Sequence, residues 1–155
     1  PMTELDLVVE ALVESGFARH AIERHTTPVA LQGFQGDTRS QVAHVVVPRR
    51  HVGASSNDIG FVQEPTGIRA IISDYDRGRY DARWLSSLYS HYARLEADKR
   101  AKEAEAERIR REEERKRLVE AQRSAVIERA KAAGYMVQEE RVADKVRLVL
   151  VRRTY

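Results

Sequence analysis

The chain contains no cysteine, and proline, glycine and aromatic residues are scarce in it. The absence of thiols excludes disulfides, thiolate-held zinc, iron–sulfur clusters and a cysteine nucleophile, and it is compatible with a reducing compartment. No apolar run approaches the roughly 18 residues that a membrane span needs, and no segment has the pattern of a secretory signal peptide. We therefore expect a soluble, cytoplasmic protein without a membrane partner.

A chain of 155 residues is long enough for one domain with its own hydrophobic core. Charged residues make up 33% of it, and the 27 basic and 24 acidic side chains leave a formal net charge of +3. So small an excess permits contact with an anionic partner but does not predict one.

The N-terminal part of the chain combines one helical pattern with strand patterns. Apolar residues recur at helical spacing over 5–13, and Gly16 follows where a helix would end. Strands are indicated at 17–23 and at 26–31, where Pro28 suits an edge strand.

Further strand patterns are rich in β-branched and apolar residues, and they lie at 41–47, 58–63, 68–73, 135–141 and 145–153. The second and third of these flank Glu64-Pro65-Thr66-Gly67, which favours a hairpin because proline presets one backbone dihedral and glycine tolerates the other. The last two predict a C-terminal hairpin. Together the patterns predict an α+β fold with an antiparallel sheet.

A single very long helix is predicted between the two hairpins. Asp81 is in the position of an N-cap for a helix that begins at Ala82, and neither glycine nor proline follows until Gly134. About fifty residues of helix would be about 75 Å long. Apolar stripes over 85–95 and 126–133 predict that the two ends of this helix dock.

The middle of the long helix is dominated by charge. Coiled-coil spacing would place Lys99, Lys102 and Glu113 in the seam, so the length of a coiled coil is present without its continuous apolar stripe. Oppositely charged pairs at helical spacing, such as Glu107 with Arg111, instead support one solvated helix.

The domain prediction follows from that division of the helix. Residues 1–97 with 125–155 are expected to form one α+β domain. Residues 98–124 are expected to be a charged helical arm inserted in the long helix.

Several of these segments resemble one known family. The matching features are Gly33-Phe34-Gln35-Gly36 with Arg39, then Asn57-Asp58-Ile59-Gly60-Phe61, Tyr92, Ala133-Gly134-Tyr135 and Val146-Arg147-Leu148. They resemble the uncharacterised bacterial, phage and plastid domain family that includes the conserved chloroplast reading frame Ycf thirty-five, over most of the chain apart from the arm.

Two departures separate this chain from that family. Residues 71–76 replace a segment that usually bears a tryptophan, and 98–124 resembles an insertion into a shorter helix. The resemblance implies a compact α+β domain and, in bacteria, association with an AAA+ ATPase of the MoxR type. It implies no known activity.

Three carboxylates are candidates for an acidic cluster. Asp58, Asp74 and Asp76 stand at the ends of predicted strands, where they could converge for acid–base work or hold a divalent ion. The alternative is that Asp58 caps a turn and that Asp74 and Asp76 accept hydrogen bonds from loop amides. The histidines show no metal-ligand spacing, and we predict neither a metal site nor a cofactor.

A basic surface is the second kind of candidate site. The turn that contains Gly33 and Gly36 could direct amides at a phosphate with help from Arg39, or it could be a tight hairpin in which Arg39 pairs with Asp58. Four loop arginines could form a rim for nucleotide or nucleic acid, or they could simply be solvated: Arg49, Arg50, Arg77 and Arg79.

The function hypotheses follow in order. The leading one is a non-enzymatic interaction module whose helical arm reaches a partner protein or a second copy of the chain. A binder of nucleotide or nucleic acid that uses the basic residues is the alternative. An enzyme is the third hypothesis, because no nucleophile elbow, Ser–His–Asp order or redox motif is present.

Overall fold

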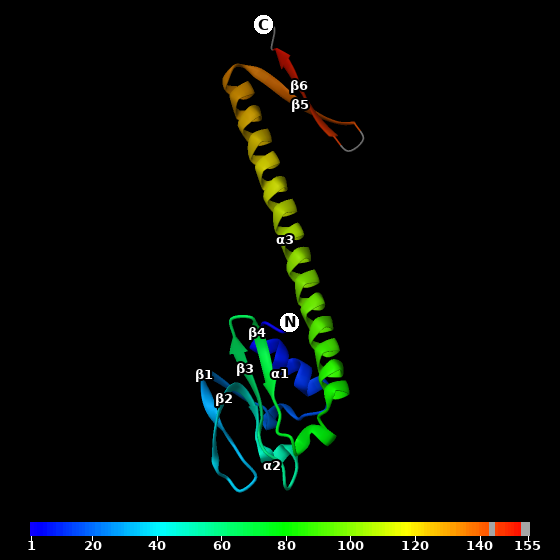
Figure 1. Cartoon of the computed structure of the whole chain (residues 1–155). Helices are drawn as coiled ribbons and strands as arrows, with labels where there is room; N and C mark the ends of the chain where they lie inside the picture. Colours follow the sequence, from blue (N-terminus) through cyan, green and yellow to red (C-terminus); the bar gives the residue numbers. More distant parts are fainter. Residues whose placement is uncertain (143–144, 153–155) are drawn as a thin grey trace. The chain divides into compact units, whose positions relative to one another are not determined.

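The computed structural model describes residues 1–142 and 145–152, and it divides the chain into two compact units, Pro1–Ala101 and Lys102–Tyr155. Figure 1 shows an antiparallel sheet, a short N-terminal helix, one very long helix and a C-terminal hairpin. The predicted α+β class is therefore confirmed.

The first unit holds most of the secondary structure. Its elements are α1 (Leu5–Glu14), β1 (Glu23–Gln32), β2 (Thr38–Val47), α2 (Arg49–Val52), β3 (Ile59–Glu64) and β4 (Gly67–Ile71), with short 3₁₀ turns at Arg19–Ala21 and Asp76–Gly78. The first turns of α3 (Ala82–Ala132) complete it. The strands form one antiparallel sheet in the order β1-β2-β3-β4.

The first predicted helix ends as its sequence indicates. Gly16 follows α1 with φ of 104°, a left-handed conformation that glycine adopts without strain. Its amide donates to the Val13 carbonyl at 3.0 Å, and the Phe17 amide donates to the Leu12 carbonyl at 3.1 Å. These bonds satisfy carbonyl groups that the end of a helix leaves open.

The strand predicted at 17–23 is wrong over most of its length. Residues Arg19–Ala21 form a 3₁₀ turn, in which the Ala21 amide donates to the Ala18 carbonyl at 2.8 Å. Phe17 turns inward instead of extending, because its ring packs against aromatic rings from a later part of the chain. β1 begins only at Glu23.

Pro28 lies inside β1, and β1 is an edge strand of the sheet, as predicted. The register of β1 on β2 shifts between Arg24 and Val29, where proline supplies no amide for the ladder. A proline at this position is tolerated because, in the described part of the chain, no strand pairs with the other side of β1.

One face of the sheet carries the main core of the first unit. Val8 and Leu12 of α1 are fully buried in one cluster with Phe61 of β3 and with Leu88 and Tyr92 of α3. The apolar stripe at the start of the long helix therefore docks, as predicted.

The other face of the sheet holds a second, smaller cluster that includes Leu31, Ala43 and Val46. Gly60 of β3 lies beneath it. A Cβ atom on Gly60 would come within 2.7 Å of the Ala43 Cβ and 2.8 Å of a Leu31 methyl group. Glycine at this position is what lets β1 and β2 close over the sheet.

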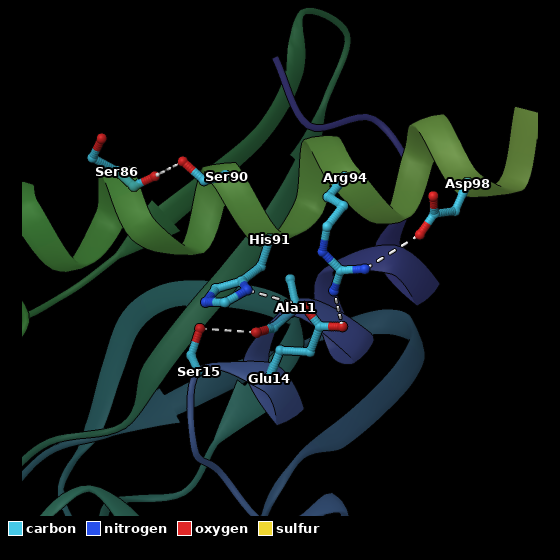
Figure 2. A network of polar contacts seen from close by, with 8 residues as sticks. All are labelled: Ala11, Glu14, Ser15, Ser86, Ser90, His91, Arg94 and Asp98. Carbon is cyan, nitrogen blue, oxygen red and sulfur yellow. Dashed lines mark hydrogen bonds and ion pairs between the residues drawn. The ribbon is translucent and has the colours of Figure 1, made fainter.

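Polar contacts join α1 to α3 at the rim of the main core (Figure 2). The Glu14 carboxylate accepts a hydrogen bond from Arg94 and lies 3.0 Å from His91 Nδ1, and Arg94 also pairs with Asp98 at 3.2 Å. The neighbouring Arg94 and His91 lower the pKa of Glu14, although desolvation opposes them. The two helices are thus joined by charge as well as by apolar packing.

The long helix begins at the predicted cap and does not break. Asp81 Oδ1 accepts the amides of Arg83 and Trp84 at 3.0 and 2.9 Å. From there α3 runs continuously to Ala132. Every residue from 101 to 122 is exposed except Glu107, which is partly covered.

The second unit consists of the rest of α3 and the predicted C-terminal hairpin, β5 (Tyr135–Val142) with β6 (Lys145–Arg152). The expected link at 143–144 and Arg153 lie outside the described residues. Gly134 joins helix to strand with φ of 84°. Arg123 of the helix pairs with Glu139 of β5. Among the described residues of this unit, Ala130 alone is a buried apolar residue. The assignment of 125–155 to the same domain as 1–97 stays a prediction.

Candidate functional site

Asp58 is a buried carboxylate whose two oxygens are both occupied. Its Oδ2 accepts the Gln32 amide and its Oδ1 accepts the Arg49 amide, each at 2.7 Å. The Asp58 amide donates in turn to the Gln32 carbonyl at 3.0 Å. Asp58 thereby ties the end of β1 to the first turn of α2, which is the behaviour of a capping residue.

The glycine-containing turn between β1 and β2 has few free amides for a phosphate. The Gly33 amide donates to the Asp37 carbonyl at 2.8 Å, and the Gly36 amide donates to the Gly33 carbonyl at 2.9 Å. The Phe34 amide donates to Asn57 Oδ1 at 3.0 Å. A phosphate cradle here would have to break these bonds, so the geometry favours the tight hairpin.

Arg39 does not take the position expected of it. The hydrogen-bond acceptors on Asp58 serve main-chain amides, so the guanidinium of Arg39 is not their partner. Its Nη1 atom is enclosed and has no hydrogen-bond partner among residues 1–142 and 145–152. A partly buried guanidinium nitrogen without an acceptor is costly, which makes Arg39 a group that an anion would stabilise.

Two of the predicted arginines share one groove. An open pocket of about 460 Å³ beside β1 and α2 is lined by Glu23, His25, Arg49, Arg50 and Asp58 among others. Arg50 Nη2 lies 3.1 Å from Glu23 Oε1, and His25 Nε2 lies 3.5 Å from Glu23 Oε2. Glu23 therefore offsets part of the positive charge that this groove gathers.

The other two loop arginines lie apart from that groove. Arg77 pairs with Asp74 at 3.1 Å and lines a pocket beside β4. Arg79 donates to the Val52 carbonyl at 3.2 Å, and its guanidinium lies 5.4 Å from the centre of the Tyr80 ring. Arg79 lines a third pocket, near His51, so the four arginines are distributed over three pockets, and a common basic rim stays a prediction.

Asp76 is buried in a set of hydrogen-bond donors. Its Oδ2 accepts the Asn57 amide at 3.1 Å and the Ser73 hydroxyl at 2.5 Å. Burial raises the pKa of this carboxyl, but the hydrogen bonds from Ser73, Ser56 and Asn57 outweigh burial, and the net pKa is lowered. Asp76 is held ionised to organise a loop.

Asp74, by contrast, is 89% exposed in its side chain and faces Arg77. The two aspartates thus occupy different environments, although they are close in sequence. Within the described ranges, 1–142 and 145–152, no three histidine or carboxylate side chains are placed to hold a metal ion. Nor is any helix of this part of the chain long and apolar enough to cross a membrane.

Glu23 and His25 of the groove are not among the site residues predicted from the sequence. Nothing local marks them, because they meet Arg49 and Arg50 only when β1 lies beside α2. Asn57 was noted only for a resemblance, although a short polar side chain just before a strand commonly binds loop amides. That signal predicts a local contact only, and the Phe34 amide that Asn57 accepts at 3.0 Å lies 23 residues earlier in the chain.

The exposed part of α3 is the second candidate site. Its charges pair along the helix, at the spacings predicted for Glu107 with Arg111 and for Glu112 with Lys116 (2.8 and 2.9 Å). Hydrogen bonds from Arg111 and Lys116 lower the pKa values of Glu107 and Glu112 respectively. Each exposed pair contributes only a few tenths of a kcal/mol, so it is their repetition that supports the helix.

Comparison of this chain with models of known protein families, with curated proteins and with solved structures finds no match in any of the three.

Proposed function

We propose that this chain is a non-enzymatic interaction module and that residues 98–124 of α3 are the surface that a partner protein or a second copy contacts. The observation that carries the proposal is the exposure of every residue from 101 to 122 except Glu107. A helix that is supported by its own ion pairs does not need to pack on its own chain, and its whole circumference is available to another one.

Apolar side chains on the charged segment give it something to bind with. Ile109, Leu118 and Val119 are 46%, 59% and 54% exposed. Burial of exposed aliphatic side chains favours association, and the surrounding charges of both signs select a complementary partner. The charged segment of α3 would therefore pair with a helix or another element of a partner protein or of a second copy.

The resemblance to the Ycf thirty-five family supports one class of partner. We extend the proposal to an accessory factor of a MoxR-type AAA+ ATPase. The test is direct binding between the purified chain and the MoxR-type ATPase of the same organism. Absence of binding would remove this extension and leave the interaction module itself untouched.

Removal of the segment in whole turns tests the module. Deleting residues 100–124 takes out about seven turns at 3.6 residues per turn, so the helix on either side keeps its phase. We expect the variant to keep its fold by circular dichroism and to lose self-association in light scattering, or to lose the partner that the intact chain captures. Unchanged binding by the folded variant would contradict the proposal.

A second variant separates a binding surface from a spacer. The substitutions E107R, R111E, E112K and K116E keep the composition and the 107/111 and 112/116 pairs but exchange the charges within them. They also remove the pairs of Glu107 with Arg110 and of Glu112 with Arg108, so circular dichroism must first show that the variant keeps its helix content. If the segment is a contact surface, binding should fall. If the segment only sets a length, binding should survive this exchange and fail in the deletion.

The alternative function is binding of nucleotide or nucleic acid in the groove of Arg49 and Arg50. The clustering of both guanidinium groups with His25 favours it. Binding of labelled single-stranded oligonucleotides should then weaken by on the order of tenfold between low and physiological salt, and Arg50→Gln should reduce this slope. Arg110→Gln, at an exposed position of α3, is the matched control. A response that is independent of salt would exclude this function.

A further inference from the structure

β4 is the second edge of the sheet, and its outer side is only partly covered. The Ile68 amide points away from β3 and donates to the Met2 carbonyl at 2.7 Å. Because alternate residues of a strand direct their main-chain groups to the same side, Ala70 directs its amide and carbonyl outward as well. Among residues 1–142 and 145–152, no main-chain acceptor outside the strand ladder takes the Ala70 amide.

A groove runs along this uncovered part of the edge. It has a volume of about 540 Å³ and lies between residues 69–72 on one side and Tyr80, Ala82 and Leu85, before and within the first turn of α3, on the other. Gln41 of β2 also lines it. Ile72 and Leu85 are half-buried and line it with apolar surface. A groove of this size, with main-chain donors and acceptors on one wall, suits an extended peptide.

The charges of the groove indicate the chemistry of its occupant. Arg69 and Arg77 both line it, and each is paired with an exposed acid, Glu64 at 2.8 Å and Asp74 at 3.1 Å. Exposed ion pairs exchange partners at little cost. The carboxylate of the lining, Asp81, is committed to the cap of α3. The lining therefore contributes two arginines, whose acidic partners lie outside it, and one carboxylate that is already bound to main-chain amides.

We propose that an extended, acidic segment of a partner protein adds to β4 as a further strand, beginning at Ala70 where the contact with Met2 ends. Its main chain bonds to the outward groups of Ala70, one apolar side chain enters between Ile72 and Leu85, and an Asp or Glu faces Arg69 or Arg77. This site is independent of the proposed function of the charged helix.

The charge of the groove favours an acidic segment of another protein over a second copy of this chain. A second β4 would bring Arg69 together with its paired Glu64, so it would supply no surplus of negative charge to the two arginines of the groove. The free edge of β6 carries Arg147 and Arg152 and would add further positive charge. An acidic segment from another protein is the complementary choice.

Ala70→Pro tests the proposal without removing a bond of the sheet. Because the Ala70 amide points outward, proline at this position leaves the ladder between β3 and β4 intact, and it blocks a strand that would add outside. Ala70→Ser keeps the amide and is the matched control. The probe is a phage-displayed library of random peptides, panned on the full chain, with the selected sequences then made as fluorescent synthetic peptides.

We expect the selected peptides to carry Asp or Glu next to an apolar residue. Ala70→Pro should weaken their binding by about tenfold or more, while Ala70→Ser should change it less than about threefold. In hydrogen exchange, the bound peptide should slow exchange of the Ala70 amide.

The charge-reversed variant R69E/R77E keeps the proposal testable if Ala70→Pro fails to fold. It should reverse the preference from acidic to basic peptides. The proposal is overturned if no peptide is selected above background, if selected peptides bind Ala70→Pro as tightly as the unaltered chain, or if their binding is indifferent to the charge at 69 and 77.

Discussion

At the scale of single residues, buried carboxylates in this protein organise main chain instead of performing chemistry. Asp58 and Asp76 are 6% and 5% exposed, and both accept amides from segments distant in sequence. An ionised carboxylate can accept several hydrogen bonds at once, which suits it to gather a loop. Asp76 is the clearer case, because three residues donate hydrogen bonds to its carboxylate: Ser73, Ser56 and Asn57.

Asp76 gives the protein a sensitivity to acid that can be measured. Its pKa is lowered in the folded state, so its contribution to stability is complete above the pKa of an unfolded aspartate, about 4, and is lost as the pH falls through the folded value. Asp76→Asn should cost about 1–3 kcal/mol at pH 7, because the new amide nitrogen faces donors. Urea unfolding at pH 7 and at pH 3 should show a smaller difference in this variant than in the unaltered chain. Asp74→Asn, at an exposed position, should change neither the free energy of unfolding at pH 7 nor its difference between pH 7 and pH 3.

Residues whose roles depend on their immediate neighbours were predictable from the sequence. Gly16 and Asp81 end and begin helices as expected, since a cap is decided by residues within one turn. The amides that Asp58 accepts, and the absence of Arg39 from its carboxylate, were not predictable in the same way. They depend on which strands become neighbours, and a single sequence does not contain that information.

At the scale of elements, the start of α1 depends on a side chain from another helix. The Tyr92 hydroxyl of α3 accepts the amides of Thr3 and Glu4 at 2.9 and 3.0 Å. Glu4 is the N-cap of α1, and its amide is among the donors that the first turn of a helix leaves open. The Tyr92 ring is 1% exposed in the main core. One residue thus both packs the two helices together and caps one of them.

Tyr92→Phe isolates the cap from the packing, because the ring stays and only the hydroxyl is lost. We expect a loss of about 1–3 kcal/mol in the free energy of unfolding, since two partly buried amides lose their acceptor. Tyr89→Phe, on the same helix but 48% exposed, is the control and should be nearly neutral. Chemical denaturation of both variants measures the difference. Equal effects would show that the hydroxyl does not act as a cap.

The elements themselves were predicted well where one period dominates. The long helix and the hairpin around residues 64–67 follow from the absence of helix breakers and from a proline–glycine turn. The segment 17–23 has no such dominant period, and tertiary packing of Phe17 decides its conformation.

At the scale of the whole molecule, both hydrophobic clusters are built from residues up to Leu95. The compact unit Pro1–Ala101 therefore contains every described residue of either cluster. By contrast, an isolated two-stranded hairpin is marginally stable in water, and the second unit adds little buried apolar surface to it.

A chain that ends at Ala101 should consequently fold and unfold cooperatively with nearly the midpoint of the full chain. Thermal unfolding followed by circular dichroism is the measurement, with 102–155 as the complementary fragment, which should show no cooperative transition. A drop of several degrees in the first fragment would indicate that 125–155 stabilises it, as the domain prediction from sequence requires. The two outcomes decide where the domain ends.

The hydrogen bond between Met2 and Ile68 has a consequence for solubility. An edge strand with unsatisfied amides is a template on which other chains can polymerise. The first two residues shield one end of β4, and at Gly67 the fit is so close that a Cβ would lie 2.9 Å from the Met2 carbonyl oxygen. Loss of this contact would expose the Ile68 amide and lengthen the open edge of the sheet. Pro1 and Met2 therefore protect β4 from association with other chains.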